Sequence, residues 1–275
     1  MSIPFVKTRP PAGERLLAVS VLAAMLSFAC TSHGAIAADM SMPMKSPPAE
    51  PAYQWTGCYA GLNGGGGAVA SNFQSTVDPG TYLGATDAAK VTNDGTGSHD
   101  NSNFIGGGQL GCNWQTGTVV IGLEGDFDYF HGTSSFFNNT DFLPVLGNSF
   151  VIGQTVTTNY LATVRPRIGI AADRNFAYVT GGVAFTRADY TESYSAPPGI
   201  GTATGSQLLT GWVAGAGWEY ALSSHWLFRL EYLFAAFPTA NAVGVITDPG
   251  VGSNVLRGST DLILQSARAA VNYKF

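Results

Sequence analysis

The chain has 275 residues, of which 11% are charged and 35 are glycine, whereas an average soluble domain has about 25% charged residues and about 7% glycine. An aromatic content of 12% excludes a disordered chain, and the absence of a three-residue glycine repeat excludes collagen. The net charge of −5 gives no electrostatic reason to expect a nucleic-acid partner. Low charge without a long apolar run is typical of a membrane β-barrel, whose lipid-facing residues are dispersed along the sequence.

Residues 1–38 are predicted to be a signal peptide. A basic start precedes the apolar stretch 16–29, which is too short to span a membrane as a helix and fits a secretory signal core. Small residues just beyond it predict cleavage near Ala38. The alternative is a lipoprotein acylated at Cys30.

The predicted mature chain starts with a Met- and Pro-rich segment, 39–52, that is expected to be a linker. The remaining residues, 53–275, are predicted to form one outer-membrane barrel domain. Alternation of apolar and polar residues dominates this domain, as expected of two-faced strands.

The clearest alternating segments are 119–130, 160–171 and 226–236. Weaker patterns occur at 53–70, 103–115, 176–187, 210–221 and 262–275. These segments predict eight strands, and a tilted membrane strand needs about 9–11 residues.

The predicted connections alternate strictly in length. Those at 116–118, 172–175 and 222–225 are short. Those at 71–102, 131–159, 188–209 and 237–261 are long. Tight turns on the periplasmic side and long loops outside characterise outer-membrane barrels. The predicted fold class is therefore all-β, an eight-stranded antiparallel up-and-down transmembrane β-barrel with periplasmic termini and extracellular loops.

Charged residues cluster on one face of the predicted strands, which must be the lumen because the other face meets lipid. The residues expected to form this lumen network are Glu124, Asp126, Asp128, Arg165, Arg167, Arg229, Glu231 and Arg268. Buried charges are tolerated when they are paired, and an eight-stranded barrel is narrow enough for side chains to fill it. A cation site at the three neighbouring carboxylates is the alternative, but the two arginines on the next strand favour ion pairs.

Several separated motifs resemble one family. Trp55–Gly61 (WTGCYAG) and 106–114 (GGGQLGCNW) resemble the first two strands of the small alphaproteobacterial outer-membrane immunogenic proteins, porin-family barrels of the Opa-like and OmpA-like kind. The segments 124–126, 163–169 and 269–275 resemble their third, fourth and last strands. The resemblance implies an eight-stranded barrel exposed at the cell surface. Some members are described as haem binders, adhesins or antigens, and no shared catalytic residue comes with the family.

Cys58 and Cys112 depart from the family pattern, which usually has an aromatic residue at these positions. The mature chain is exported to an oxidising compartment. If Trp55 is aligned with Gln115 on consecutive antiparallel strands, Cys58 falls opposite Cys112, which predicts a disulfide. Two free, lipid-facing thiols are the alternative.

The last strand ends in the one-faced series Val271, Tyr273 and Phe275. The resemblance implies that this aromatic C-terminus is the signal read by the barrel assembly machinery. An incidental terminal Phe on an ordinary lipid-facing stripe is the alternative.

The sequence thus predicts an integral outer-membrane surface protein with a structural, envelope-integrity and antigen- or adhesin-like role, without cofactor or catalytic activity. Its expected partners are outer-membrane lipid, the barrel assembly machinery and a host or environmental surface ligand. A small porin or channel is the first alternative, although water-filled porins have 16–18 strands. A haem- or ligand-binding surface protein is the second. A lipid A acylase or deacylase would need a positioned nucleophile and base, and the sequence has only four His.

Overall fold

The computed structural model describes residues 52–275. The predicted signal peptide, 1–38, and all but the last residue of the predicted linker, 39–52, lie outside the described residues. The cleavage site near Ala38 and the alternative acylation at Cys30 therefore stay predictions.

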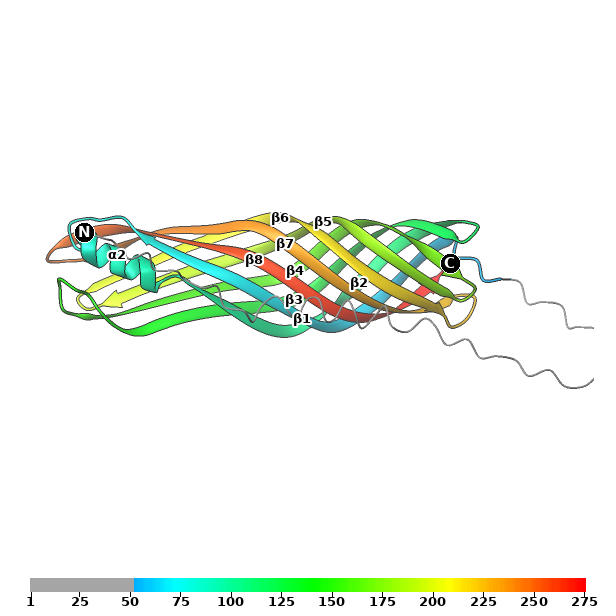
Figure 1. Cartoon of the computed structure of the whole chain (residues 1–275), viewed down its shortest axis with the longest axis horizontal. Helices are drawn as coiled ribbons and strands as arrows, with labels where there is room; N and C mark the ends of the chain where they lie inside the picture. Colours follow the sequence, from blue (N-terminus) through cyan, green and yellow to red (C-terminus); the bar gives the residue numbers. More distant parts are fainter. Residues whose placement is uncertain (1–51) are drawn as a thin grey trace, which may run out of the picture. The chain divides into compact units, whose positions relative to one another are not determined.

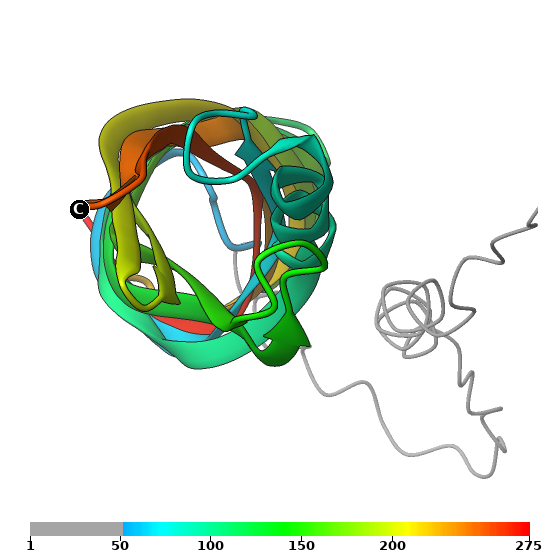
Figure 2. The ribbon, with the colours of Figure 1, turned by 90° about the vertical axis from the view of Figure 1, so that its left-hand side faces the viewer.

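Eight antiparallel strands form a closed barrel in which each strand pairs with the next and β8 pairs with β1 (Figure 1). The strands are β1 (Gly57–Val77), β2 (Gly97–Thr116), β3 (Val119–Phe142), β4 (Ser149–Ala172), β5 (Asn175–Ala196), β6 (Gly199–Ala221), β7 (Trp226–Asp248) and β8 (Gly252–Lys274). A helix, α2 (Ala85–Asp94), lies between β1 and β2, at the barrel end opposite the C-terminus. Figure 2 shows the ring of strands from the end that carries α2. The predicted all-β, eight-stranded antiparallel up-and-down barrel is confirmed.

The short connections of the prediction are confirmed at one end of the barrel. There the strands are joined by 117–118, 173–174 and 222–225. Gly117 has a positive φ of 62°, which a glycine adopts without strain in so tight a turn.

The prediction of four long loops is wrong. Most of 71–102, 131–159, 188–209 and 237–261 continues as strand, and the connections at this end are 78–96, 143–148, 197–198 and 249–251. The cause is a reversal of the alternation: in this half of β4, Phe150, Ile152 and Val156 are buried inside the barrel. The alternating residues Thr155 and Thr157 are partly exposed and face outward. Strands with a polar outer face and an apolar core remain paired in water as well as in lipid.

The outward face of the barrel is apolar over one section of each strand and mainly polar over the other, where Phe137, Ile200 and Val243 are among the exposed apolar exceptions. On β3 the outward residues from Val119 to Tyr129 include Ile121, Leu123 and Phe127, all at least 44% exposed. Equivalent apolar runs occupy 160–170 on β4, 208–218 on β6, 226–236 on β7 and 263–273 on β8. Runs of this length match the ~9–11 residues of a membrane-spanning strand, so we call them the lipid-facing section.

The strand pairing shifts register at one border of the lipid-facing section. Shifts occur between Tyr129 and Gly132 on β3, between Thr158 and Ala162 on β4, and between Phe237 and Ala240 on β7. Such β-bulges bend and twist the strands locally. The border therefore separates the spanning part of the barrel from the extended part that carries α2.

The barrel interior is layered. Next to the short turns lies a small apolar cluster that includes Trp55, Val120 and Phe176. Under α2 lies a large apolar core, which includes Phe73, Phe130 and other buried apolar side chains from all eight strands. The charged residues lie between these two apolar layers, within the lipid-facing section.

Candidate functional site

The strand registers place opposite charges on neighbouring strands of the lumen. Glu124 pairs with Arg165 across β3 and β4. Glu231 pairs with Arg268 across β7 and β8. Because these residues take the inward positions of their strands, all four side chains converge inside the barrel, where each is at most 4% exposed.

Arg165 is the centre of this network and is fully buried, with 0% exposure. Its Nη2 lies 2.8 Å from Glu124 Oε1 and 2.6 Å from Asp126 Oδ2. Its Nη1 lies 3.2 Å from Glu231 Oε1. One guanidinium thus joins carboxylates of β3 to a carboxylate of β7, across the lumen.

Arg268 makes a second bridge across the lumen. Its Nη2 lies 2.7 Å from Glu231 Oε2 and 3.2 Å from Asp126 Oδ2. Its Nη1 forms an ion pair with Asp128, and Asn63 on β1 donates a hydrogen bond of 2.8 Å to the same carboxylate. All three β3 carboxylates are therefore engaged by arginines.

Glu219 belongs to the network although the sequence analysis did not select it. Its Oε1 accepts a 2.7 Å hydrogen bond from Arg229 Nε and pairs with Arg167. Arg229 also forms an ion pair of 2.6 Å with Glu124. The signal was present in the sequence, because Glu219 alternates with the outward residues Trp218 and Tyr220 and so takes an inward position.

Aromatic side chains close the network on the side of the short turns. The Arg167 guanidinium lies 4.8 Å from the centre of the Tyr59 ring and 5.0 Å from that of Tyr178. Tyr178 donates a 2.8 Å hydrogen bond to Glu231. A side chain at Gly111 would collide with the Tyr59 ring, and one at Gly217 with the Tyr178 ring, so both glycines permit close packing.

The N-terminal end of the domain fills the lumen between the charged network and the short turns. Trp55 is fully buried, and its ring lies 5.1 Å from that of Phe176. Its Nε1 donates a 3.1 Å hydrogen bond to Asp173 O in a short turn. Charged and aromatic side chains therefore fill the lumen along the spanning section, and residues 52–275 contain no cluster of His, Cys, Asp or Glu suited to holding a metal ion.

The two cysteines face each other on the first hairpin. The β1–β2 register pairs Cys58 with Cys112, and a disulfide joins their Sγ atoms. This is the register expected from the alignment of Trp55 with Gln115. Cys58 is exposed and Cys112 is half-buried, so the bond lies on the outer wall, outside the lumen network.

The C-terminal residues face outward at the border near the short turns. Val271 and Tyr273 are 45% and 39% exposed. The Tyr273 ring lies 5.2 Å from Trp226 and 5.7 Å from Phe275. The Phe275 amide donates a 2.9 Å hydrogen bond to Cys58 O, which ties the terminus to β1.

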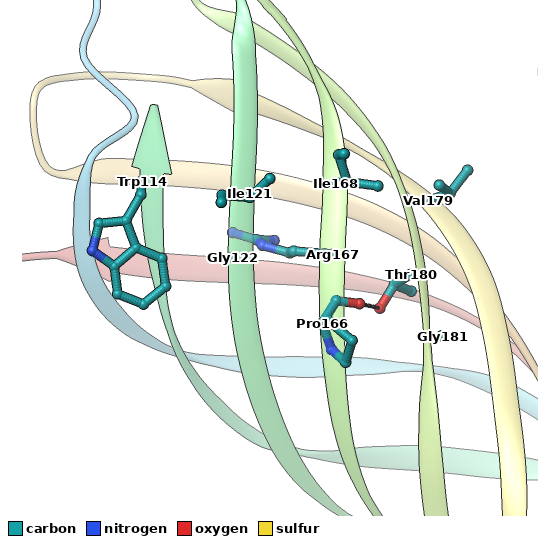
Figure 3. Close-up of a pocket in the computed structure, with 9 residues that line it drawn as sticks. All are labelled: Trp114, Ile121, Gly122, Pro166, Arg167, Ile168, Val179, Thr180 and Gly181. Atoms are coloured by element: carbon teal, nitrogen blue, oxygen red, sulfur yellow. Dashed lines mark hydrogen bonds between the residues drawn. The ribbon is translucent and has the colours of Figure 1, made fainter. Parts of the chain in front are cut away.

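A hollow of about 460 Å³ on the outer wall has no counterpart in the sequence analysis (Figure 3). Trp114, Ile121 and Ile168 are among its apolar lining residues. Within this lining, Thr180 Oγ1 donates a 2.9 Å hydrogen bond to the carbonyl of Pro166. Most of its lining faces outward, but Arg167 of the lumen network also lines it.

A closed up-and-down barrel with an outward apolar section and a polar interior defines an integral membrane β-barrel. Within residues 52–275, no helix is long and apolar enough to cross a bilayer. The family model described as outer membrane protein beta-barrel domain matches residues 21–275, and the chain belongs to that family.

Similar proteins of known sequence are outer-membrane immunogenic proteins. The chain is 30% identical to the 31 kDa outer-membrane immunogenic protein of Brucella melitensis biotype 1 over 259 residues, which is 92% of this chain and 97% of the relative. It is 26% identical to the 25 kDa outer-membrane immunogenic protein of Brucella canis, over 94% and 97% of the two chains. The family resemblance seen in the sequence is confirmed, and the protein is an outer-membrane protein.

Two solved structures of similar shape are also outer-membrane proteins. OprG from Pseudomonas aeruginosa has 13% identity and a TM-score of 0.39, and the match covers 81% of this chain and 98% of OprG. The protease OmpT from Escherichia coli has 9% identity and a TM-score of 0.44, over 82% and 99% of the two chains. At these scores neither likeness bears on function.

Proposed function

We propose that the protein is a closed-lumen barrel of the outer membrane with a structural, envelope-integrity role and a surface-interaction role. The observation that carries the proposal is the continuous ion-paired layer inside the lipid-facing section. Arg165 contacts carboxylates of both β3 and β7, and so does Arg268. A solute path along the axis would have to separate these pairs.

The energetic cost of separating the pairs supports a closed lumen. Removing one partner of a buried ion pair costs about 3–5 kcal/mol, because the other charge is left uncompensated. Several such pairs share the same carboxylates here, so opening would disrupt the network cooperatively. We therefore favour the structural role over a small porin or channel.

Planar-bilayer recording tests the closed lumen. The reconstituted mature protein is expected to show no stable large conductance. The double variant Arg165→Ala/Glu231→Ala, which removes a buried pair across the lumen, is expected to conduct more often. The matched control is Arg257→Ala/Asp78→Ala, since that pair is exposed on the outer wall. Stable large channels in the wild type would favour the porin alternative.

The extended half of the barrel supports the surface role. Its outward face is mainly polar, and its end carries α2 and the tip residues Val145 and Val251, which are 72% and 60% exposed. We propose that this end is extracellular and that the termini are periplasmic. The relatives are named immunogenic, a property that this chain would share if its tips reach the cell surface.

Complementation of a deletion strain separates the structural role from the surface role. Wild type and a tip variant, Val145→Ser/Leu146→Ser, are both expected to restore resistance to detergent, because the spanning section is unchanged. Only wild type is expected to retain binding of cells to host or environmental surface material. A deletion strain with normal detergent resistance would contradict the envelope role.

A further inference from the structure

In the extended half, which carries α2, the strands are not all joined by backbone hydrogen bonds around the barrel. The β2–β3 pairing ends at Ile105 and Phe130. Beyond that pair, 97–104 of β2 pairs only with β1, and 131–142 of β3 pairs only with β4. We call this gap in the ladder the β2–β3 seam.

The pairing is also interrupted on the opposite side of the barrel. Between β6 and β7 it stops at Thr204 and resumes at Trp212. The unpaired stretch of β7 contains Pro238, which has no N–H to donate to a ladder. The extended half therefore consists of two half-sheets, β3–β6 and β7–β8–β1–β2, which are paired again only near the tip of β6 and β7.

Side chains, not a backbone ladder, hold the β2–β3 seam together. Ser134 Oγ donates a 3.2 Å hydrogen bond to His99 O, and Asn101 donates one to Thr133 O. The α2 connection adds a latch, in which Asp87 accepts hydrogen bonds of 2.9 and 3.3 Å from the amides of Val145 and Leu146. Asn138 on β3 also donates a 3.3 Å hydrogen bond to Asp94 O, and Lys90 of α2 pairs with Asp141 of β3 at 2.5 Å. Side-chain contacts and the α2 connection, rather than paired strands, thus close this side.

Glu192 joins the two half-sheets inside the barrel. It lies on β5, is 0% exposed, and its Oε1 accepts a 2.6 Å hydrogen bond from Ser75 Oγ on β1. Gln154 Nε2 donates to the same Oε1 at 3.0 Å and to Gly95 O at the end of α2 at 2.9 Å. The carboxyl group is therefore connected to both half-sheets and to the latch.

No positive charge faces this carboxyl group among the described residues. From β1 it meets Ser75, from β4 Gln154, and from β8 Gly258, where any side chain would collide with it. The titratable group in contact is the Tyr190 phenol of its own strand, at 3.4 Å. An ionised carboxylate at this place would be buried without an ion-pair partner, with hydrogen bonds from Ser75, Gln154 and Tyr190 in place of one.

We infer that Glu192 is a proton-operated switch of the extended half: protonated, it holds the two half-sheets together, and ionised, it releases the β2–β3 seam. The unpaired β6–β7 stretch is the hinge, and the α2 connection is the latch that opens. This inference concerns the extended half alone and does not depend on the proposed lumen or orientation.

The direction of the pH dependence follows from the burial of Glu192. Burial raises the pKa of its carboxyl group, while the hydrogen bonds from Ser75, Gln154 and Tyr190 lower it, and burial dominates. The closed state is therefore fully stabilised below the ordinary glutamate pKa of about 4.3. That stabilisation is lost as the pH rises from this value through the raised pKa.

Hydrogen exchange of the purified mature protein in detergent, measured by mass spectrometry from pH 4 to pH 8, tests the switch. After correction for intrinsic exchange rates, exchange in 97–104 and 131–138 is expected to rise by up to about tenfold per pH unit above pH ~4.3 and then level off. Exchange in 119–129, in the lipid-facing section, is expected to stay constant.

Three variants identify the group responsible. Glu192→Gln is expected to give slow exchange of the seam at every pH. Asp189→Asn, three residues away on the outward face of β5, is expected to keep the wild-type profile. Ser75→Ala removes a hydrogen bond that lowers the pKa of Glu192, and is expected to move the levelling-off to higher pH.

A wild-type pH profile in Glu192→Gln would overturn the inference, and so would loss of the profile in Asp189→Asn. If Glu192→Gln fails to fold, Ser75→Ala decides, because an unshifted profile in that variant would rule out Glu192 as the titrating group. Constant exchange of the seam in the wild type would rule out the switch itself.

Discussion

Arg165 is the side chain whose loss is expected to weaken the barrel most directly. Arg165→Ala leaves Glu124, Asp126 and Glu231 without one of their cationic partners in a fully buried layer. We predict that the free energy of unfolding falls by about 3–5 kcal/mol. Denaturant titration in detergent, followed by the heat-modifiable gel mobility of the folded barrel, measures this change.

The matched control is Arg257→Ala. Arg257 forms an ion pair of 3.2 Å with Asp78, but both side chains are about half exposed, at 54% and 47%. Exposed pairs contribute about 1 kcal/mol or less. Equal losses of stability in the two variants would show that burial of the network contributes nothing.

The Cys58–Cys112 bond is a second prediction at this scale. Thiol titration of denatured, unreduced mature protein is expected to find no free thiol, and peptide mapping to find 58 linked to 112. The bond closes a loop of sequence separation 54. In the chain-entropy model such a closure stabilises the fold by about 4 kcal/mol, so reduction is expected to lower stability.

Two free thiols in freshly purified outer membranes would contradict the disulfide and favour the alternative of two free, lipid-facing cysteines. A linkage of either cysteine to a second molecule would instead contradict the intramolecular bond. The double variant Cys58→Ser/Cys112→Ser controls for effects of the reductant on the rest of the barrel.

Most charged residues of the lumen network could be predicted, because alternation places them on the inward face of their strands and opposite charges fall on adjacent strands. The carboxylates 124, 126 and 128 alternate in a strongly two-faced strand, and the arginines 165 and 167 follow on its neighbour. Glu219 is not among the predicted residues because the alternation in its segment, 210–221, is weak. The full set of partners could not be predicted, since Arg165 reaches β7 across the lumen and no local pattern reports that distance.

At the scale of the strands, the sequence predicted the part that lies in lipid and misjudged the rest. Alternation with outward apolar residues identified runs such as 119–130 and 160–171. Beyond the border most outward residues are polar, such as Thr133, Thr155 and Thr191, while most inward ones are apolar, so the same period continues with the opposite polarity. Glycine, proline and polar clusters in this half then suggested loops where the structure has strands.

The C-terminal strand carries the third prediction. Deleting Phe275 removes the terminal aromatic ring beside Tyr273 and the hydrogen bond to Cys58 O. We expect unassembled protein in the periplasm, because the resemblance implies that this terminus is the assembly signal. Cell fractionation with a gel-mobility assay for the folded barrel measures the outcome.

The appropriate comparison for that deletion is Phe275→Tyr, which keeps an aromatic ring at the terminus. It is expected to assemble as wild type does. Normal assembly of the deletion variant would favour an incidental terminal Phe on a lipid-facing stripe.

For the whole molecule, the two ends of the barrel differ in a way that assigns them to opposite sides of the membrane. One end has the short turns and the C-terminus. The other has the extended half-sheets, the α2 connection and a polar outer wall. The lipid-facing section lies next to the short turns, so the extended half must project into solvent on the other side.

This asymmetry carries the last prediction, which is the topology. Single cysteines at Val145 and Val251, at the α2 end, are expected to react with an impermeant maleimide on intact cells. A cysteine at Leu222, 56% exposed in a short turn, is expected to react only after the outer membrane is permeabilised. Because Leu222 is exposed to a similar degree, burial would not account for its protection. Labelling of Leu222→Cys on intact cells, with protection of Val145→Cys and Val251→Cys, would place the extended half in the periplasm instead.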